Sequence, residues 1–432
     1  MYLIYSFIYI IAVIFLLPFE YFKRSKDLRE KWLREKFGFF DSSFNLHTPP
    51  SPPVTTGGTR GAVWVHAVSV GEVIAASPLL TRIRERYPSR TIILSTITDT
   101  GQRVAGERSP GDTKIIYLPF DIPTILKSVL EKVRPEILII IETELWPNMF
   151  RVFGERGVPV VLMNGRISER SYRGYKKLSF FMRNVLSYVN FFGMQDDEYA
   201  ERIRSLGVDG ARIRTLGNFK FDSSPASRTP EWASKIAGPV ITAGSTHEGE
   251  EELIASIYVE LKKDFDDLNL VIAPRHPERF RGVEEMLRSK KLSFMKRSAF
   301  NEENTESPII KGHIILLDTV GELSAVYGIT DIAIVGKSFR GYGGQNPLEP
   351  ASWGKPVVCG PHMENFPVIQ DFYREGAAIE VSEKGLYSRL RELLSSPDKA
   401  KEIGSKAHEL YTKNSGAVER AMEIIESYIS KT

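Results

Sequence analysis

The chain has 432 residues, of which 42% are hydrophobic and 26% are charged, and its formal net charge is +3. This composition excludes a disordered protein, and the length predicts two domains rather than one. The small net charge gives no indication of a nucleic-acid partner, and the single cysteine, Cys359, excludes an internal disulfide and fits a reducing compartment.

The N-terminus is strongly apolar. Its first 19 residues carry no charged side chain, and the basic residues Lys23, Arg24 and Lys26 follow shortly after. At about 1.5 Å per residue, a helix of this length nearly crosses a hydrocarbon core of roughly 30 Å. Neither a basic leader nor a small-residue cleavage site is present, so we predict a single-pass transmembrane anchor over residues 1–22 rather than a signal peptide. The basic residues then place the rest of the chain in the cytoplasm. A buried or interfacial helix is the alternative.

The next segment, residues 23–60, has two parts. The first is basic, aromatic and compatible with a helix, and it could lie along an anionic membrane surface or be an ordinary solvated helix. The second, residues 47–61, is rich in Pro, Gly and Thr and predicts a flexible tether.

From Gly61 onward, short apolar runs alternate with helical patterns. Strands are predicted at 62–68, 90–97, 113–120, 136–142, 159–164 and 189–195, and then at 239–245, 268–275, 314–318, 332–337, 356–361 and 377–381. Such an alternation predicts an α/β protein with parallel sheets covered by helices on both faces. We therefore expect two Rossmann-like domains facing across a cleft, at 61–217 and 239–432, joined by a polar linker at 218–238.

Two strand-to-helix turns have the same spacing of a hydroxyl and a carboxylate. Ser69 and Glu72 fit a capping box, and Ser245 and Glu248 repeat it in the second half. The spacing alone does not separate a helix cap from a catalytic base. No neighbouring motif supports a further role for Glu248, so we interpret Glu248 as a cap. Both turns follow strands, where open α/β sheets bind their ligands.

A glycine-rich stretch in the second half precedes a predicted helix start. Gly341, Gly343 and Gly344 allow close backbone approach, and Asn346 is expected to be the N-cap of a helix that begins with Pro347 and has Glu349 at its third position. The loop fits an anionic ligand, or is simply a flexible loop before a capped helix.

A cationic side chain strengthens the case for an anionic ligand in this half. Arg275 ends a predicted strand and could meet a phosphate. The chain contains neither a Walker A sequence nor a G-x-G-x-x-G opening, which argues against an NTPase or a dehydrogenase.

Ionisable side chains also gather in the first half. Glu142 and Glu144 follow a hydrophobic strand, where an apolar surrounding can tune their ionisation, although a surface loop explains them equally well. Lys220 lies at the domain junction, where most lysines are solvated.

No metal site is expected. The seven histidines show no paired metal-ligand spacing, and the acidic run Asp196–Glu198 is interpreted as a helix cap. A basic and aromatic stretch at 165–186 suits a phosphate-bearing lipid or is a solvated helix, and it resembles no RNA-binding motif.

Seven segments together resemble the 3-deoxy-D-manno-octulosonic acid (Kdo) transferases of lipopolysaccharide biosynthesis. In chain order they are HAVSVGE, ETELWPN, NGRISERSYRGY, LGNFKFD, APRHPERF, DTVGELSAVY and GGQNPLEPASWGKPVV. One such segment would be weak, but seven in order are specific, and the resemblance runs from the N-terminal anchor nearly to the C-terminus. The family consists of inverting glycosyltransferases of the GT-B type, so the resemblance implies this fold. This sequence departs from the family's pattern in two places, a long tether at 47–61 and the polar stretch 301–308. Neither place contains a matched motif.

The resemblance also implies substrates and residue roles. The donor would be CMP-Kdo and the acceptor a lipid A precursor (lipid IVA) at the inner membrane, with no nucleic acid, no cofactor and no metal. Glu72 matches the general base, and Glu142 and Lys220 match the positions that stabilise the transition state. The CMP-binding segments match the residues Pro274, Arg275, Val320, Gly321, Glu322, Asn346, Pro347, Leu348 and Glu349.

The acceptor and the base are then expected in the first domain and the CMP-sugar in the second. The C-terminal helical run, about 398–430, is expected to pack back across the first domain. Two rival functions remain, a GT-B transferase that uses a UDP-sugar and a membrane-tethered lipid- or sugar-binding module without turnover.

Overall fold

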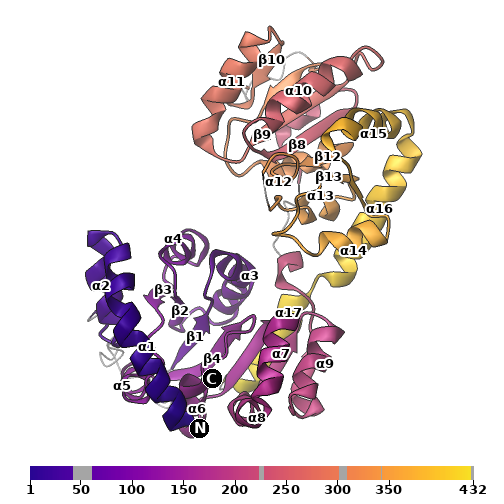
Figure 1. Cartoon of the computed structure of the whole chain (residues 1–432). Coiled ribbons are helices and arrows are strands. Elements are labelled where there is room, and N and C mark those ends of the chain that lie inside the picture. The colour runs from indigo at the N-terminus through magenta and orange to yellow at the C-terminus, as the bar shows by residue number, and fades with distance from the viewer. Residues whose placement is uncertain (42–60, 223–227, 301–308, 342, 430–432) are drawn as a thin grey trace. The chain divides into compact units, whose positions relative to one another are not determined.

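The computed structural model describes residues 1–41, 61–222, 228–300, 309–341 and 343–429. The chain forms two compact units, one made of Met1–Ser223 and Ser415–Thr432 and the other of Ser224–Asn414 (Figure 1). The expected tether, apart from Gly61, and the polar stretch 301–308 lie outside the described residues.

The first unit is built on a sheet of seven parallel strands in the order β3-β2-β1-β4-β5-β6-β7. These strands are β1 (Ala62–His66), β2 (Ile92–Thr96), β3 (Lys114–Tyr117), β4 (Pro135–Ile141), β5 (Val160–Gly165), β6 (Phe191–Met194) and β7 (Ile213–Thr215). The strand order reverses between β1 and β4, and ligands of open α/β sheets bind beyond the carboxyl ends at such a point.

Helices cover both faces of this sheet (Figure 1). They are α1 (Tyr2–Lys23), α2 (Lys26–Lys36), α3 (Val70–Arg86), α4 (Asp99–Arg108), α5 (Pro123–Val133), α6 (Pro147–Glu155), α7 (Glu169–Lys177), α8 (Ser179–Ser187), α9 (Asp197–Ser205) and α17 (Ala417–Tyr428). Successive residues of a strand point to opposite faces of the sheet and so belong to two different cores. Trp64 packs with α5, α6 and α8, while Val63 and Val65 pack with α3 and α17. The continuous apolar strands reflect this burial on both faces.

The second unit repeats the architecture, with seven parallel strands in the order β10-β11-β9-β8-β12-β13-β14. Its strands are β8 (Val240–Thr246), β9 (Asn269–Pro274), β10 (Phe294–Lys296), β11 (Ile314–Leu316), β12 (Ile332–Val335), β13 (Val357–Cys359) and β14 (Ala378–Glu380). Its helices are α10 (Glu250–Leu261), α11 (Phe280–Ser289), α12 (Leu323–Val326), α13 (Leu348–Ser352), α14 (Ile369–Arg374), α15 (Glu383–Ser395) and α16 (Pro397–Asn414). The order of this sheet reverses between β8 and β12.

The expected α/β class with two parallel sheets is confirmed, and every predicted run contains a strand. The sequence missed β7 and β10, which are three-residue strands at the edges of the sheets.

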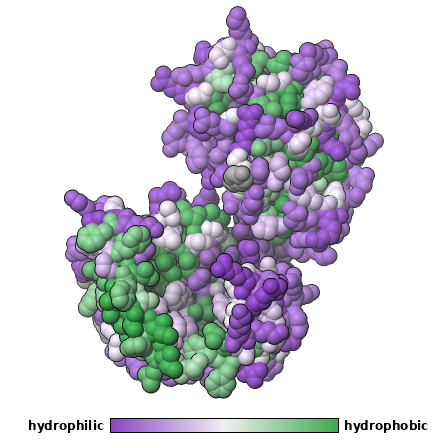
Figure 2. All heavy atoms as spheres, viewed as in Figure 1, coloured by the Kyte–Doolittle hydropathy of each residue, from purple (hydrophilic) through white to green (hydrophobic). Residues whose placement is uncertain are grey.

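The apolar N-terminal helix α1 has the length and hydropathy of a membrane-spanning helix. One of its faces packs against the first unit, and the opposite face exposes the hydrophobic surface that is green in Figure 2. Helix α2 does not extend freely as a solvated helix: Trp32 is buried with Tyr117 and Phe120, and the Glu35 carboxylate accepts a hydrogen bond of 2.7 Å from the backbone N–H of Tyr117.

The passage between the units differs from the expected linker at 218–238. Phe219 and Phe221 are buried in the first unit, and Trp232 is buried in a core of the second. These aromatic side chains account for the difference, because a segment that buries large apolar groups belongs to a core rather than to a linker.

The C-terminal helical run divides between the units. Helix α16 packs in the second unit, and α17 packs on α3 in the first through Val418, Ala421 and Met422. Gly416 makes the break with a positive φ of 80°. The Asp222 carboxylate accepts backbone N–H groups from the start of α17.

Candidate active site

Glu72 lies in the first turn of α3, directly after the carboxyl end of β1. The Ser69 hydroxyl accepts a hydrogen bond of 3.3 Å from the backbone N–H of Glu72, so Ser69 is the N-cap, as the spacing predicts. The Glu72 carboxylate in turn accepts bonds from the Val68 backbone N–H (2.7 Å) and the Ser69 hydroxyl (3.0 Å). Glu72 is therefore part of the cap, and the cap holds its carboxylate at the strand-order reversal.

The ionisation of Glu72 is strongly perturbed. The side chain is only 8% exposed, and this burial, followed by repulsion from Glu142 and Glu144, raises its pKa from 4.5 to about 7. The hydrogen bonds from Val68 and Ser69 oppose the rise. A carboxyl group with a pKa near the working pH is suited to accept a proton.

Glu142 and Glu144 follow β4, on the other side of the strand-order reversal. Glu142 has a φ of 59°, a left-handed conformation that is uncommon for a residue with a side chain, and its backbone N–H bonds to the Met163 carbonyl at 2.9 Å. Burial raises the pKa of Glu142, and burial together with Glu142 raises that of Glu144 to about 7.

Lys220 provides a positive charge near the Glu142 carboxylate. Burial lowers its pKa, and attraction to Glu142 opposes that effect. The short helical turn that carries Lys220 is held by the buried Asn164, whose side-chain oxygen accepts the Phe219 backbone N–H at 3.1 Å. Arg166, two residues beyond Asn164, also lies within electrostatic range of Glu142 and Lys220.

The first unit thus brings Glu72, Glu142 and Lys220 together at one edge of its sheet. Two carboxylates and a lysine in partial burial can remove a proton and stabilise charge that develops nearby. The surface-loop and solvated-lysine alternatives do not describe these side chains, because Glu72 is buried and Glu142 and Lys220 are half-buried.

In the second unit, Pro274 ends β9 and Arg275 follows it. Pro274 is buried as the last residue of the strand, while the Arg275 side chain is exposed beyond it. The Arg275 backbone N–H bonds to the Thr246 carbonyl at 3.0 Å, which ties the segment to the end of β8. The Arg275 guanidinium, among the described residues, lies in solvent and is available to an anion.

The segment after β11 contains Val320, Gly321 and Glu322. Val320 is largely exposed, and Gly321 turns the chain with a φ of 95°. The Glu322 carboxylate accepts bonds from Arg297 (2.8 Å) and from the Trp232 indole N–H (2.9 Å). Glu322 therefore anchors the loop.

The NPLE segment forms the turn into α13. The Asn346 side-chain oxygen accepts the Leu348 backbone N–H at 3.0 Å, and its amide donates to Glu349 at 3.2 Å. This is the contact expected of an N-cap, although the regular helix begins one residue later than predicted, at Leu348. Pro347 and Leu348 are buried and fix the turn.

The second hydroxyl–carboxylate turn differs from the first. Glu248 is not a cap: its side chain is 91% exposed and lies 3.7 Å from Arg279. Helix α10 begins two residues later, after Gly249, whose φ of 86° suits glycine. Ser245 has a φ of 54°, a left-handed conformation that an N-cap does not normally adopt.

The carboxylate that accepts the backbone hydrogen bonds of this turn belongs to Glu250, a residue that the sequence analysis missed. Fully buried, it accepts bonds from the backbone N–H groups of His247 (2.9 Å), Lys337 (2.7 Å) and Phe339 (3.1 Å). It thereby joins the start of α10 to the loop after β12, at the strand-order reversal of the second sheet. Only the run of acidic residues at 248, 250, 251 and 252 could have signalled it.

The sequence reading also passed over residues that support the first-unit site, among them Asn164 and Tyr175. Burial and Glu144 raise the pKa of Tyr175, which lies on α7. The interpretation of the acidic run at 196–198 as a cap is confirmed, since Asp196 accepts the Tyr199 N–H at 2.8 Å. In the part of the chain that the structure describes, no three His, Cys, Asp or Glu side chains gather as metal ligands do.

The chain was compared with known protein families and sequences. Residues 31–223 match the family model described as 3-deoxy-D-manno-octulosonic-acid transferase (kdotransferase). The 3-deoxy-D-manno-octulosonic acid transferase of Haemophilus influenzae is 33% identical over 92% of this chain and 92% of its own length. That of Bordetella pertussis is 32% identical over 85% of this chain and 87% of its own.

Solved structures support the fold. A glycosyltransferase from Rickettsia africae is similar over 86% of this chain and all of its own, with 14% sequence identity and a TM-score of 0.51. The two parallel seven-stranded sheets and this similarity establish a GT-B fold. With relatives above 30% identity along almost its whole length, the chain belongs to the Kdo transferase family of glycosyltransferases, which acts in lipopolysaccharide biosynthesis.

Proposed function

We propose that this protein transfers Kdo from CMP-Kdo to a lipid A precursor, lipid IVA, with inversion at the anomeric carbon. The observation that carries the proposal is the group of Glu72, Glu142 and Lys220 at the strand-order reversal of the first sheet. Glu72 is buried with its pKa raised to about 7, and Glu142 and Lys220 are half-buried. The family's reaction needs a base and charge stabilisation, and this group has the chemistry for both.

In the proposed step, Glu72 takes the proton from an acceptor hydroxyl while that oxygen attacks the anomeric carbon of Kdo. The bond from this carbon to the phosphate oxygen breaks, and CMP leaves with the electron pair. Lys220 offsets negative charge on the departing phosphate or on the Kdo carboxylate, and Glu142 stabilises positive charge that develops on the sugar. The step requires neither a metal nor a cofactor.

The first unit is the proposed acceptor domain and the second the proposed donor domain. The exposed Arg275 guanidinium suits the donor phosphate. The backbone of the 320–322 turn and the NPLE segment 346–349 suit the nucleotide, with Glu349 accepting hydrogen bonds from ribose hydroxyls. The protein is proposed to act at the inner membrane with both units on the cytoplasmic side, since α1 is apolar enough to associate with lipid and the single cysteine fits a reducing compartment.

The direct test is incubation of the purified protein with CMP-Kdo and lipid IVA, followed by mass analysis, which also counts the Kdo residues added. Absence of any Kdo-bearing product would refute the proposal. Thermal stabilisation by CMP but not by UDP separates the proposed donor from a UDP-sugar, because a ligand stabilises the fold that binds it. Arg275→Ala is expected to weaken CMP binding at least tenfold, and unchanged binding would remove Arg275 from the donor site.

A further inference from the structure

Helix α1 has two chemically different faces. Its four tyrosines and its serine lie on one stripe, at positions 2, 5, 6, 9 and 21, and this stripe is partly buried against the first unit together with Val13 and Leu17. The opposite face has no hydroxyl group. It exposes Leu3, Phe7, Ile14, Phe15, Phe19 and Phe22, each by more than half.

The polar face is attached to the first unit by specific hydrogen bonds. The Tyr5 hydroxyl donates to the Asp121 carboxylate at 2.8 Å, and the Tyr9 hydroxyl accepts the Asp121 backbone N–H at 3.2 Å. Ser6 and the buried Asn148 exchange a bond of 2.9 Å from the amide to the hydroxyl. Asn148 belongs to the ETELWPN segment that carries Glu142, so the helix is attached to a segment that contributes to the candidate active site.

The attachment runs along the whole helix. Near its start, the Tyr2 ring packs edge-on against Phe181 of α8, with ring centres 5.3 Å apart. Near its end, Leu17 and Tyr21 pack against the buried cluster of Trp32, Tyr117 and Phe120. No long segment of α1 therefore stands away from the α/β unit, as Figure 1 also shows.

A helix attached in this way cannot cross a bilayer without taking its neighbours along. Arg151 and Glu155 on α6, Arg156 directly after it, and Lys132 on α5 would have to enter hydrocarbon, where each charge costs several kcal/mol or more. If α1 instead detached in order to cross, its tyrosine hydroxyls and Ser6 would lose their partners in a medium that offers no others.

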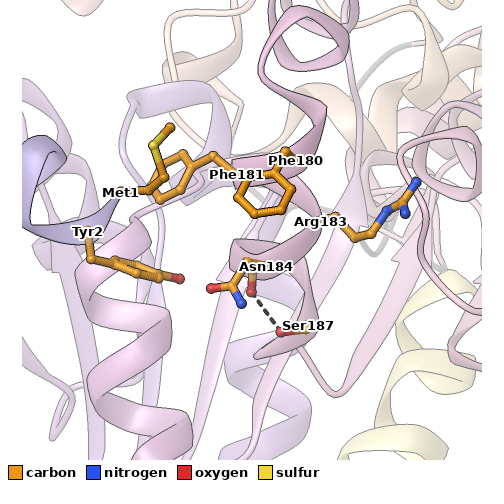
Figure 3. A pocket seen from close by; sticks show the side chains of 7 residues that line it. All are labelled: Met1, Tyr2, Phe180, Phe181, Arg183, Asn184 and Ser187. Carbon is orange, nitrogen blue, oxygen red and sulfur yellow. Dashed lines mark hydrogen bonds between the residues drawn. The ribbon is translucent and has the colours of Figure 1, made fainter.

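The apolar surface continues past the start of α1. Met1 and Tyr2 share a pocket of about 500 Å³ with Phe180, Phe181 and Arg183 of α8 (Figure 3). Phe180 is 83% exposed and the adjacent Leu178 is 56% exposed. Lys176, Lys177 and Arg183 are exposed next to these apolar side chains, the arrangement that favours anionic lipid head groups at a membrane surface.

From these contacts we propose that α1 does not span the membrane but lies in its plane, attached to the first unit by its tyrosine face. Its apolar face and Phe180 enter one leaflet of an anionic phospholipid bilayer, and the lysines of α7 contact the head groups. This inference rests on the membrane location proposed above. It means that a lipid acceptor in that leaflet meets the same unit that carries Glu72.

Topology gives the first test. The protein carries one epitope tag at its N-terminus and another at its C-terminus, and protease is added to right-side-out spheroplasts and to inverted inner-membrane vesicles. An in-plane helix leaves both tags on the cytoplasmic side, so both are cleaved only in inverted vesicles. Cleavage of the N-terminal tag in spheroplasts would overturn the in-plane arrangement alone. Recovery of the protein in the soluble fraction would overturn the membrane location as well, while leaving the transfer reaction to its own assay.

A disulfide trap gives the second test. Ser6→Cys with Asn148→Cys is expected to form a disulfide in membranes on mild oxidation, and the buried natural Cys359 does not interfere. In a spanning helix, residue 6 would lie about 25 Å beyond the last helical turn, out of reach of residue 148. Leu3→Cys with Asn148→Cys is the matched control, because Leu3 faces outward. No disulfide in the first pair, or equal yields in both, would contradict the proposal.

The head-group contact is tested by flotation of the purified protein with phosphatidylcholine vesicles that contain phosphatidylglycerol. Lys176→Glu with Lys177→Glu is expected to reduce the bound fraction severalfold. Lys384→Glu with Lys401→Glu makes the same charge change on exposed residues of the second unit and is expected to have a much smaller effect. Equal losses in the two variants would show that α7 does not contact the membrane.

Discussion

Replacement of Glu72 by glutamine is expected to stabilise the protein while it removes transfer activity. The pKa of Glu72 rises from 4.5 to about 7 on folding, first through burial and then through repulsion from Glu142 and Glu144. Between about pH 4.5 and pH 7 the folded state therefore binds more protons than the unfolded state, so stability falls as the pH rises through this window. Above about pH 7, the ionised Glu72 carboxylate lowers the free energy of unfolding by at most about 3 kcal/mol, at roughly 1.4 kcal/mol per pKa unit.

Glutamine can retain the local structure. Its side-chain oxygen can accept the Val68 N–H, and its amide can donate to Ser69, so the cap is preserved without the charge. We expect Glu72→Gln to gain about 1–3 kcal/mol near pH 8.5, or roughly 3–10 °C in melting temperature, and to gain little near pH 5. Transfer is expected to fall by about 10²–10⁴, the usual contribution of a general base.

The assay is thermal unfolding at both pH values beside the pH dependence of kcat/KM. Wild-type kcat/KM is expected to rise with pH and to level off above about pH 7, as the base ionises. Glu85→Gln, on an exposed position of the same helix, is the control and is expected to change neither quantity. A stability gain that is equal at both pH values, or a variant with wild-type transfer, would refute the reasoning.

Three further variants test other contacts. Lys220→Met is expected to lower kcat by about 10²–10³, because it removes the charge beside Glu142, and kinetics with saturating CMP-Kdo measure the loss. Glu250→Gln is expected to destabilise the second unit by about 2–4 kcal/mol in denaturant unfolding, since a carboxylate bonded to several backbone amides becomes neutral. Its neighbour Glu248, which is exposed, is expected to tolerate the same change within about 0.5 kcal/mol, and equal effects would contradict the assignment. Asp222→Ala is expected to loosen the start of α17 by about 1 kcal/mol, seen as faster proteolysis of the C-terminus, and an unchanged rate would show that its bonds to the helix do not matter.

The local pattern of the sequence determined the class of fold and the positions of most strands. Runs such as 136–142 are apolar on both faces, so any structure that leaves one side in water is unfavourable, and only buried parallel strands remain. The three-residue strands β7 (Ile-Arg-Thr) and β10 (Phe-Met-Lys) carry no such signal, because a charged residue interrupts or ends each short apolar run. Paired aromatic residues around position 220 were likewise concealed by polar neighbours, which made a buried turn resemble a linker.

The candidate site, too, was determined partly by the sequence and partly by the tertiary structure. The sequence supplied Glu72, Glu142 and Lys220 through a family resemblance, and it placed the two glutamates after strands. Only the tertiary structure brought the three side chains together, because the strands β1 and β4 that precede the glutamates are adjacent in the sheet although far apart in the chain.

Spacing alone gave Glu72 and Glu248 the same interpretation, and tertiary packing separated them. Glu72 lies in the first turn of α3 at the strand-order reversal and is buried, whereas Glu248 projects into solvent and Glu250 is buried in its place. The same holds for α1. Its hydropathy predicts a helix that meets lipid, but only the hydrogen bonds of its tyrosine face to Asp121 show which side of it packs against the first unit. Hydropathy sums over a segment, while the partners of each side chain depend on residues more than a hundred positions away.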